Sequence, residues 1–199
     1  MSVRIAVLAS GRGTNLQALI DHFAALGERS PAQIALVASN RPHAPALERA
    51  RAAAIPVSLF DTSDDGTALV GLLQLHAIDL LVLAGYMKRI PPTVIDHFRG
   101  RIVNVHPGLL PDFGGAGMYG ARVHEAVIAK GASHSGVTVH LVDEELDHGP
   151  TIAQWKIAVR PDETAESLAA RVLAIEHILY PRAVEMIAAL RERQIFADF

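Results

Sequence analysis

Short strand-like runs alternate with helical segments over the first half of the chain, and this alternation constrains the fold more than any other feature. The predicted strands are Val3–Leu8, Ile34–Ala38, Val57–Phe60, Leu80–Ala84 and Arg101–Val105. Helical patterns lie between them, beginning near Asn15 and then covering Pro45–Ala54, Thr67–Leu75 and Pro91–Phe98. Such alternation is typical of parallel strands joined by right-handed crossover helices.

The pattern changes after Pro107. Residues Gly108–Gly120 form a predicted loop with five glycines and one proline, which is long for a connection without a function. A helix is predicted over Ala121–Lys130. Two strands follow, Gly136–Val142 and Thr151–Val159, and we expect them to pair through the loop between them.

The C-terminal part of the chain predicts one long amphipathic helix. Thr164 is a suitable cap, Glu166 lies in the first turn, and the apolar pattern runs to about Arg191. Pro181 is expected to kink or divide this helix. The whole pattern predicts an α/β fold, a Rossmann-like and mostly parallel sheet with helices on both faces, followed by a C-terminal strand pair and a long helix.

Composition narrows the classes of protein. With 199 residues, the chain is expected to form a single domain over 1–199. A net charge of −3 without any basic run argues against a nucleic-acid partner. The chain has no cysteine, which excludes disulfides, thiolate catalysis and cysteine-ligated zinc. No signal-peptide or membrane-spanning pattern is found, so a soluble cytoplasmic protein is predicted.

Asn104 and His106 stand at the end of the fifth predicted strand. They are two residues apart, so on a strand their side chains leave the same face. Pro107 favours an extended conformation at His106. An amide beside an imidazole can polarise a carbonyl and donate to the oxyanion that forms when the carbonyl is attacked. A capped strand end with a satisfied histidine explains the same residues equally well.

A second candidate site is the sequence Gly11-Arg12-Gly13-Thr14-Asn15 between the first strand and the first helix. Glycines allow close approach of the backbone, and a helix N-terminus favours an anion. A dinucleotide fingerprint would have glycine at position 16, where this chain has leucine, and the Walker pattern is missing. A plain tight turn is the alternative. The side chains of Arg12, Thr14 and Asn15 add donors that suit a monophosphate.

These motifs resemble those of the formyltransferases that use 10-formyltetrahydrofolate. The sequence from Arg101 to Pro111, together with Asp-Glu-Glu-Leu-Asp-His-Gly-Pro around Asp147, carries the resemblance. The sequence Ser-Gly-Arg-Gly-Thr-Asn-Leu-Gln-Ala-Leu is similar to the phosphate loop of the phosphoribosylglycinamide formyltransferases. This resemblance implies formyl transfer from 10-formyltetrahydrofolate, as co-substrate, to the amine of glycinamide ribonucleotide in de novo purine biosynthesis.

The resemblance also implies roles for individual residues. Asn104, His106 and Asp147 would be catalytic, and Arg12, Gly13, Thr14, Asn15 and Glu176 would bind the ribonucleotide. The folate would contact Met87, Lys88, Arg89, Ile90, Asn104, Asp143 and Glu144, because the stretch from Leu83 to Ile90 matches the family's pterin segment. Without the resemblance, Tyr86 and Met87 at a strand end would be read as core residues. His140 matches a family position near the site but is equally compatible with a structural role.

The expected mechanism assigns a charge to His106. Asn104 and a cationic His106 would stabilise the tetrahedral oxyanion. Asp147 would pair with His106 and raise the pKa of the imidazole. No metal is expected, since the spacing of His97, His124 and the other histidines is not that of a ligand set. Small molecules are the expected partners, with no nucleic acid or membrane, and both monomer and homodimer remain open.

The chain departs from the family pattern at several positions. Gly108 replaces the usual serine after His-Pro, and His148 replaces the usual glycine after the active-site aspartate. The loop Asp112–Gly120 is an uncommon variant. Asp61, Asp64 and Asp65 stand where many members carry a basic residue for the folate tail.

Four other functions are compatible with parts of this pattern. A formyltetrahydrofolate hydrolase would use the same Asn/His/Asp set, but such relatives usually carry an additional N-terminal regulatory domain. A methionyl-tRNA formyltransferase would need a C-terminal tRNA-binding domain and a basic surface. A non-catalytic folate or nucleotide binder would not need a cationic imidazole. A formate-using enzyme would need an ATP-binding signature, which is not found.

Overall fold

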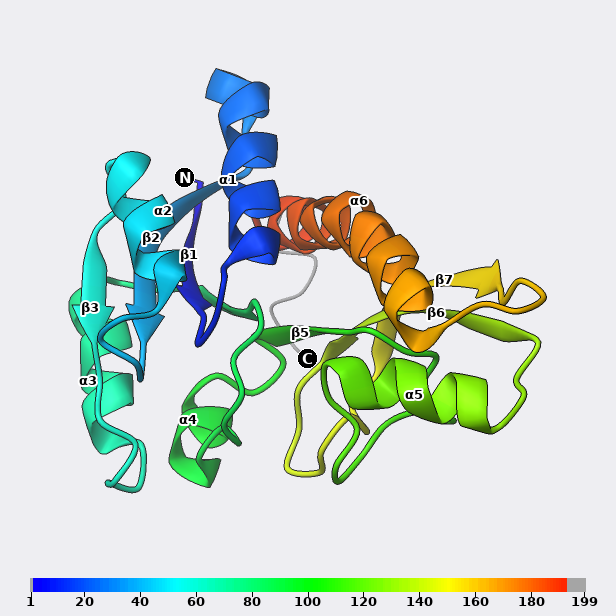
Figure 1. Cartoon of the computed structure of the whole chain (residues 1–199). Coiled ribbons are helices and arrows are strands. Elements are labelled where there is room, and N and C mark those ends of the chain that lie inside the picture. Colours follow the sequence, from blue (N-terminus) through cyan, green and yellow to red (C-terminus); the bar gives the residue numbers. More distant parts are fainter. Residues whose placement is uncertain (1, 193–199) are drawn as a thin grey trace.

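The computed structural model describes residues 2–192 and contains one seven-stranded sheet (Figure 1). The strand order is β3-β2-β1-β4-β5-β6-β7. The five parallel strands are β1 (Val3–Leu8), β2 (Ala32–Ser39), β3 (Val57–Leu59), β4 (Leu80–Leu83) and β5 (Ile102–His106). The two antiparallel strands are β6 (His134–Leu141) and β7 (Thr151–Ala158). The sheet therefore changes from parallel to antiparallel pairing at β5.

Helices cover both faces of the sheet, which buries the apolar runs of the central strands. One face packs against α1 (Thr14–Leu26), α2 (Pro45–Ala52), α5 (Ala121–Ala129) and α6 (Ala165–Glu192). The opposite face packs against α3 (Thr67–Leu75) and α4 (Pro92–His97). A short 3₁₀ turn, η1 (Gly27–Arg29), follows α1. Figure 1 shows α6 lying beside α1, with α3 and α4 on the other side of the strands.

The predicted fold class is confirmed, with one difference in detail. The predicted strand pair is present as β6 and β7, but β6 also pairs with β5 and so joins the main sheet. Helix α6 runs through Pro181 as one element, so of the two alternatives, a kink or a division, the division does not occur. The predicted domain over 1–199 includes residue 1 and residues 193–199, which lie outside the described part of the chain.

Tyr180 connects α6 to the end of the sheet where the candidate site lies. Its side chain is fully buried, and its hydroxyl contacts the backbone oxygens of Leu83 at 2.9 Å and Val103 at 3.1 Å. These oxygens belong to β4 and β5. A buried hydroxyl that donates to such oxygens stabilises the fold, because the alternative is a desolvated polar group without a partner.

We predict that Tyr180→Phe lowers the free energy of unfolding by about 1–3 kcal/mol, measured by urea denaturation. Tyr119→Phe is the matched control, because Tyr119 is exposed and should change stability by less than about 0.5 kcal/mol. Equal denaturation midpoints for the wild type and Tyr180→Phe would contradict this role.

Candidate active site

The register of β5 against β6 places polar residues of the two strands opposite each other. Asn104 pairs with His140, and His106 pairs with Thr138. Residues directly opposite in an antiparallel pair lie on the same face. Thr138 holds the segment that follows His106, since its Oγ1 donates to the carbonyl of Gly108 at 2.7 Å and accepts from the N–H of Leu110 at 3.1 Å.

His106 is buried, with 3% of its surface exposed, and it has a defined protonation pattern. Its Nε2 lies 2.7 Å from the carbonyl oxygen of Phe113. A carbonyl only accepts, so Nε2 carries a proton and donates. Nδ1 lies 3.6 Å from Oδ2 of Asp147, which is too long for a hydrogen bond but close enough for the carboxylate to attract the imidazole when it is protonated.

The prediction that His106 is cationic does not agree with its buried environment. Burial lowers the pKa of the imidazole below its ordinary value. The attraction of Asp147 and the hydrogen bond to Phe113 act in the opposite direction but are smaller. The expectation of a raised pKa was therefore wrong. The sequence showed the carboxylate but not the degree of burial.

His140 and Asn104 hold each other in place. Nδ1 of His140 lies 2.8 Å from the carbonyl of Leu141, so this nitrogen is the donor. Nε2 of a neutral His140 then has a lone pair that accepts from Nδ2 of Asn104 at 3.2 Å. The second N–H of the Asn104 amide is not used in this contact. Burial lowers the pKa of His140, which favours the neutral form that accepts this bond.

The carboxylate of Asp147 lies close to the imidazoles of both His106 and His140. Its Oδ1 lies 3.7 Å from Nε2 of His140, and its Oδ2 accepts from the N–H of Gly115 at 3.0 Å. Its backbone has a positive φ of 57°, an uncommon conformation for a residue other than glycine. The structure therefore brings Asn104, His106 and Asp147 together, as predicted, and adds His140 to the group.

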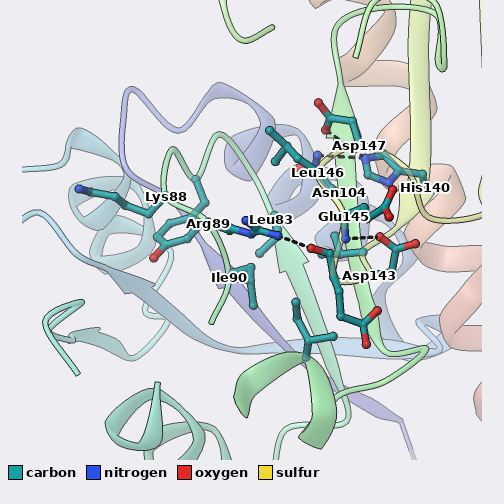
Figure 2. Close-up of a pocket in the computed structure, with 14 residues that line it drawn as sticks. Leu83, Lys88, Arg89, Ile90, Asn104, His140, Asp143, Glu145, Leu146 and Asp147 are labelled. Atoms are coloured by element: carbon teal, nitrogen blue, oxygen red, sulfur yellow. Dashed lines mark hydrogen bonds and ion pairs between the residues drawn. The ribbon is translucent and has the colours of Figure 1, made fainter. Parts of the chain in front are cut away.

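A cavity opens beside this group at the carboxyl ends of β4 and β5, where open α/β sheets bind ligands (Figure 2). Its volume is about 70 Å³. All the predicted folate-binding residues except one line it: Lys88, Arg89, Ile90, Asn104, Asp143 and Glu144. Asp147 and His140 also line it. The guanidinium of Arg89 donates to the backbone oxygen of Glu144 and so connects the two sides.

Met87 is the exception. It does not line the cavity, and 48% of its surface is exposed. Its backbone N–H donates to Oγ of Ser10 at 3.3 Å, which ties the segment after β4 to the end of β1. The resemblance implies a contact of the pterin with the backbone of this segment, so the exposed side chain does not test it and the role of Met87 stays a prediction.

A second cavity of about 230 Å³ adjoins the first and shares Tyr86, Lys88 and Arg89 with it. Phe60 and Asp64 line its far side, and Asp61 lies there too. Burial raises the pKa of Tyr86 to about 12, so its hydroxyl stays protonated at neutral pH. The sequence did not indicate this cavity, because its walls come from segments that are not adjacent in the chain.

The predicted phosphate loop lies at the N-terminus of α1. Gly13 has a φ of 73°, and a Cβ there would lie 2.7 Å from Cα of Ala46, so only glycine fits. The loop is held by α2, since the N–H of Ala46 donates to the carbonyl of Gly11 and Arg49 donates to the carbonyl of Arg12. No side chain caps this helix N-terminus.

Asn15 and Glu176, two of the residues predicted to bind the ribonucleotide, are in contact. Nδ2 of Asn15 donates to Oε2 of Glu176 at 2.5 Å, while Oδ1 of Asn15 is buried without a partner. Burial raises the pKa of Glu176 to about 7, and the bond from Asn15 opposes this shift. The two residues come from α1 and from α6. Because these helices are far apart in the sequence, the sequence alone does not predict the contact.

His148 and the aspartates after β3 do not enter the group around Asp147. The imidazole of His148 is largely exposed and faces Asp143, with Nδ1 3.3 Å from Oδ2. Within residues 2–192, no cluster of three or more His, Cys, Asp or Glu side chains could hold a metal ion. No helix in that range is long and apolar enough to span a bilayer.

Comparison with known proteins assigns the chain to a class. A model of the formyl transferase family matches residues 3–184. The chain therefore belongs to the formyl transferase family, as the motifs predicted.

Individual relatives carry a narrower name. The phosphoribosylglycinamide formyltransferase of Haemophilus influenzae is 39% identical over 92% of this chain and 85% of its own length. A chloroplastic enzyme of the same name from Vigna unguiculata is 41% identical over 96% of this chain. The chain spans 62% of that plant relative. The crystal structure of glycinamide ribonucleotide transformylase 1 from Geobacillus kaustophilus matches with a TM-score of 0.86 and 39% identity over 94% of this chain and all of that one.

The buried carboxyl of Glu176 gives a prediction for stability against pH. Its pKa rises from an ordinary 4.5 to about 7 on folding, so between these values the folded protein holds a proton that the unfolded chain releases. The contribution of Glu176 to the free energy of unfolding is therefore greatest below pH 4.5 and falls as pH rises to 7. The fall should be at most about 3 kcal/mol relative to Glu176→Gln.

Denaturation of the wild type and Glu176→Gln across this pH range measures the difference. Glu166→Gln, which changes an exposed glutamate in the first turn of α6, is the control and should run parallel to the wild type. A difference between wild type and Glu176→Gln that does not vary with pH would show that Glu176 is not protonated on folding.

Proposed function

We propose that this protein transfers the formyl group of 10-formyltetrahydrofolate to the amine of glycinamide ribonucleotide, giving formylglycinamide ribonucleotide for de novo purine biosynthesis. The observation that carries the proposal is the group formed by Asn104, His106 and Asp147 beside the cavity at the ends of β4 and β5. Membership of the formyl transferase family supports the reaction class. The cytoplasmic location, the single domain over 1–199 and the oligomeric state stay predictions.

The two substrates would bind on different elements. The phosphate of the ribonucleotide would lie on Gly13–Asn15 at the start of α1, where free N–H groups and the helix dipole favour an anion. The ribose would lie near Glu176, which contacts Asn15. The folate would lie between the segment after β4 and the loop of Asp143 and Glu144, which face each other across the cavity.

The chemistry follows from the side chains around the reacting carbon. The amine attacks the formyl carbon, and negative charge develops on the formyl oxygen. Asn104 has one N–H that is not used by His140 and can donate to that oxygen. Donors held in place before the reaction lower the barrier, because they need no reorganisation when the charge forms.

His106 and Asp147 would act as a unit during proton transfer. Burial keeps the imidazole neutral at the start, since its pKa is lowered. When the imidazole takes up a proton, the carboxylate 3.6 Å from Nδ1 stabilises the cation. A proton must move from the attacking nitrogen to the leaving nitrogen of the folate, and this pair is placed beside the cavity to assist it.

The rival activity within the same family is hydrolysis of the formyl folate, in which water replaces the amine. A purified sample is mixed with 10-formyltetrahydrofolate, with and without glycinamide ribonucleotide, and the folate absorbance is followed. We expect rapid deformylation of the folate only when the ribonucleotide is present. Equal rates without it would favour the hydrolase, and binding without turnover would favour a non-catalytic folate protein.

The phosphate loop gives a prediction about substrate binding. Thr14→Ala combined with Asn15→Ala removes side-chain donors near the phosphate, so the KM for the ribonucleotide should rise by about tenfold or more. The KM for the folate should stay within about twofold, because its site lies on other loops. Asp21→Ala, an exposed change on the same helix, is the control. Loss of folate binding with intact ribonucleotide binding would overturn the assignment.

The His106–Asp147 pair gives a prediction about coupling. Asp147→Asn removes the attraction that favours the cation, so the pKa of His106 should fall further and kcat should drop by roughly 10²–10⁴-fold. His106→Ala should cause a similar loss. The double variant should lose little more than either single variant in single-turnover rate, since the residues act as a unit.

His134→Ala is the control for this series, because His134 lies at the start of β6, far along the strand from the site. It should keep the wild-type rate. Losses that multiply fully in the double variant would show that Asp147 acts independently of His106.

A further inference from the structure

The carbonyl of Phe113 is the hydrogen-bond partner of Nε2 of His106. It comes from the loop between β5 and α5, not from the strand pair that carries the other site residues. At 2.7 Å from Nε2 it forms a short hydrogen bond within the buried part of the protein. Because a carbonyl cannot donate, the bond leaves Nδ1 as the only imidazole nitrogen with a lone pair in the neutral form.

Gly108 allows the Phe113 segment to reach this position. A Cβ at Gly108 would lie 2.8 Å from Cγ1 of Val123, 3.1 Å from Nε2 of His106 and 3.2 Å from Cβ of Phe113. These contacts are too close to be accepted without movement. The φ of Gly108 is not positive, so the glycine is needed for space and not for its backbone conformation.

The side chain of Phe113 fixes the backbone that carries the carbonyl. Its ring is buried, with 5% exposed, and belongs to the core cluster that includes Val123. Nζ of Lys130 lies 5.1 Å from the ring centroid, a favourable cation–π distance. Packing of this ring therefore holds the backbone that carries the carbonyl.

We propose that the Phe113 carbonyl, given room by Gly108, fixes His106 in the form protonated at Nε2 and so makes Nδ1 the nitrogen that exchanges protons during formyl transfer. This inference rests on the proposed function. It gives Gly108 and Phe113 the part of positioning residues, which act through His106 and need not touch a substrate.

The proton balance of the step is complete with the two substrates and His106. Attack forms the bond between the amine nitrogen and the formyl carbon and leaves a cationic nitrogen and an oxyanion. Nδ1 takes one proton from the cationic nitrogen, giving an imidazolium beside Asp147. Nδ1 then gives this proton to the folate nitrogen as its bond to the formyl carbon breaks, and the oxyanion returns to a carbonyl.

Several titratable groups surround His106 and set the pH range of this step. Burial lowers the pKa of His106, and Asp147 from the loop after β6 acts in the opposite direction by favouring the cation. A charge on His106 in turn lowers the pKa of His140 on β6 and of His124 on α5. His124 is buried and its Nδ1 has no hydrogen-bond partner. The balance favours a neutral imidazole at neutral pH, the state in which Nδ1 can accept.

The first test uses the wild-type protein labelled with ¹⁵N-histidine. The ¹⁵N spectrum at pH above the titration of His106 distinguishes the two neutral tautomers, and His106→Gln assigns the signal. We expect the form protonated at Nε2 to dominate. A dominant form protonated at Nδ1 would overturn the proposal, whatever the behaviour of any other variant.

The second test uses Gly108→Ala, which should displace the carbonyl or the imidazole. We expect a mixed tautomer signal, a single-turnover rate at least about tenfold lower, and a KM for the ribonucleotide within about twofold of wild type. The acid limb of the rate profile should move to lower pH, because the hydrogen bond to Phe113 favours the protonated imidazole. An unchanged tautomer and unchanged pH profile in a folded variant would overturn the proposal.

Gly71→Ala on α3 is the matched control. A Cβ there meets nothing within 4 Å and the backbone is not left-handed, so the rate, the profile and the His106 signal should be those of wild type. The tautomer signal tests the role of Phe113 separately from the proposed function. If the wild type has the Nε2-protonated form but transfers no formyl group to the ribonucleotide, the proposed function fails while the role of Phe113 in fixing His106 stands.

Discussion

The antiparallel pairing of β5 with β6 is the constraint on which the site depends. It sets Asn104 opposite His140 and His106 opposite Thr138, on one face of the sheet edge. A slip of one residue would move these side chains to the other face, because side chains alternate along a strand. The parallel part of the sheet, buried between two layers of helices, holds β5 rigidly enough to maintain that register.

Backbone carbonyls then decide how the two histidines are protonated. Phe113 accepts from His106, and Leu141 accepts from His140, so one imidazole has its lone pair on Nδ1 and the other on Nε2. One of these lone pairs faces Asp147 and the other accepts from Asn104. The electrostatic consequence is a buried and neutral pair of imidazoles next to a single carboxylate. Such a site can take up a proton when the reaction supplies one.

Much of this architecture is encoded locally and could be predicted. The apolar runs and the helix patterns between them identified the sheet, and the spacing of Asn104 and His106 identified the strand end that carries the site. Gly13 could be placed in a strand-to-helix turn because it lies between an apolar strand pattern and the start of a helical pattern. The features that the sequence did not predict depend on contacts between segments that are distant in the chain. The pairing of β5 with β6 places His140 beside Asn104, which the sequence left open, and burial reversed the expected pKa shift of His106.

The central claim is that one cleft holds both substrates with the formyl carbon between Asn104 and His106. A crystal structure with glycinamide ribonucleotide and a non-reactive 10-formyl folate analogue tests it most directly. The account predicts the phosphate on Gly13–Asn15, and the formyl group within hydrogen-bond distance of Nδ2 of Asn104 and next to Nδ1 of His106. A formyl group bound elsewhere, for example in the cavity lined by Phe60 and Asp64, would contradict it.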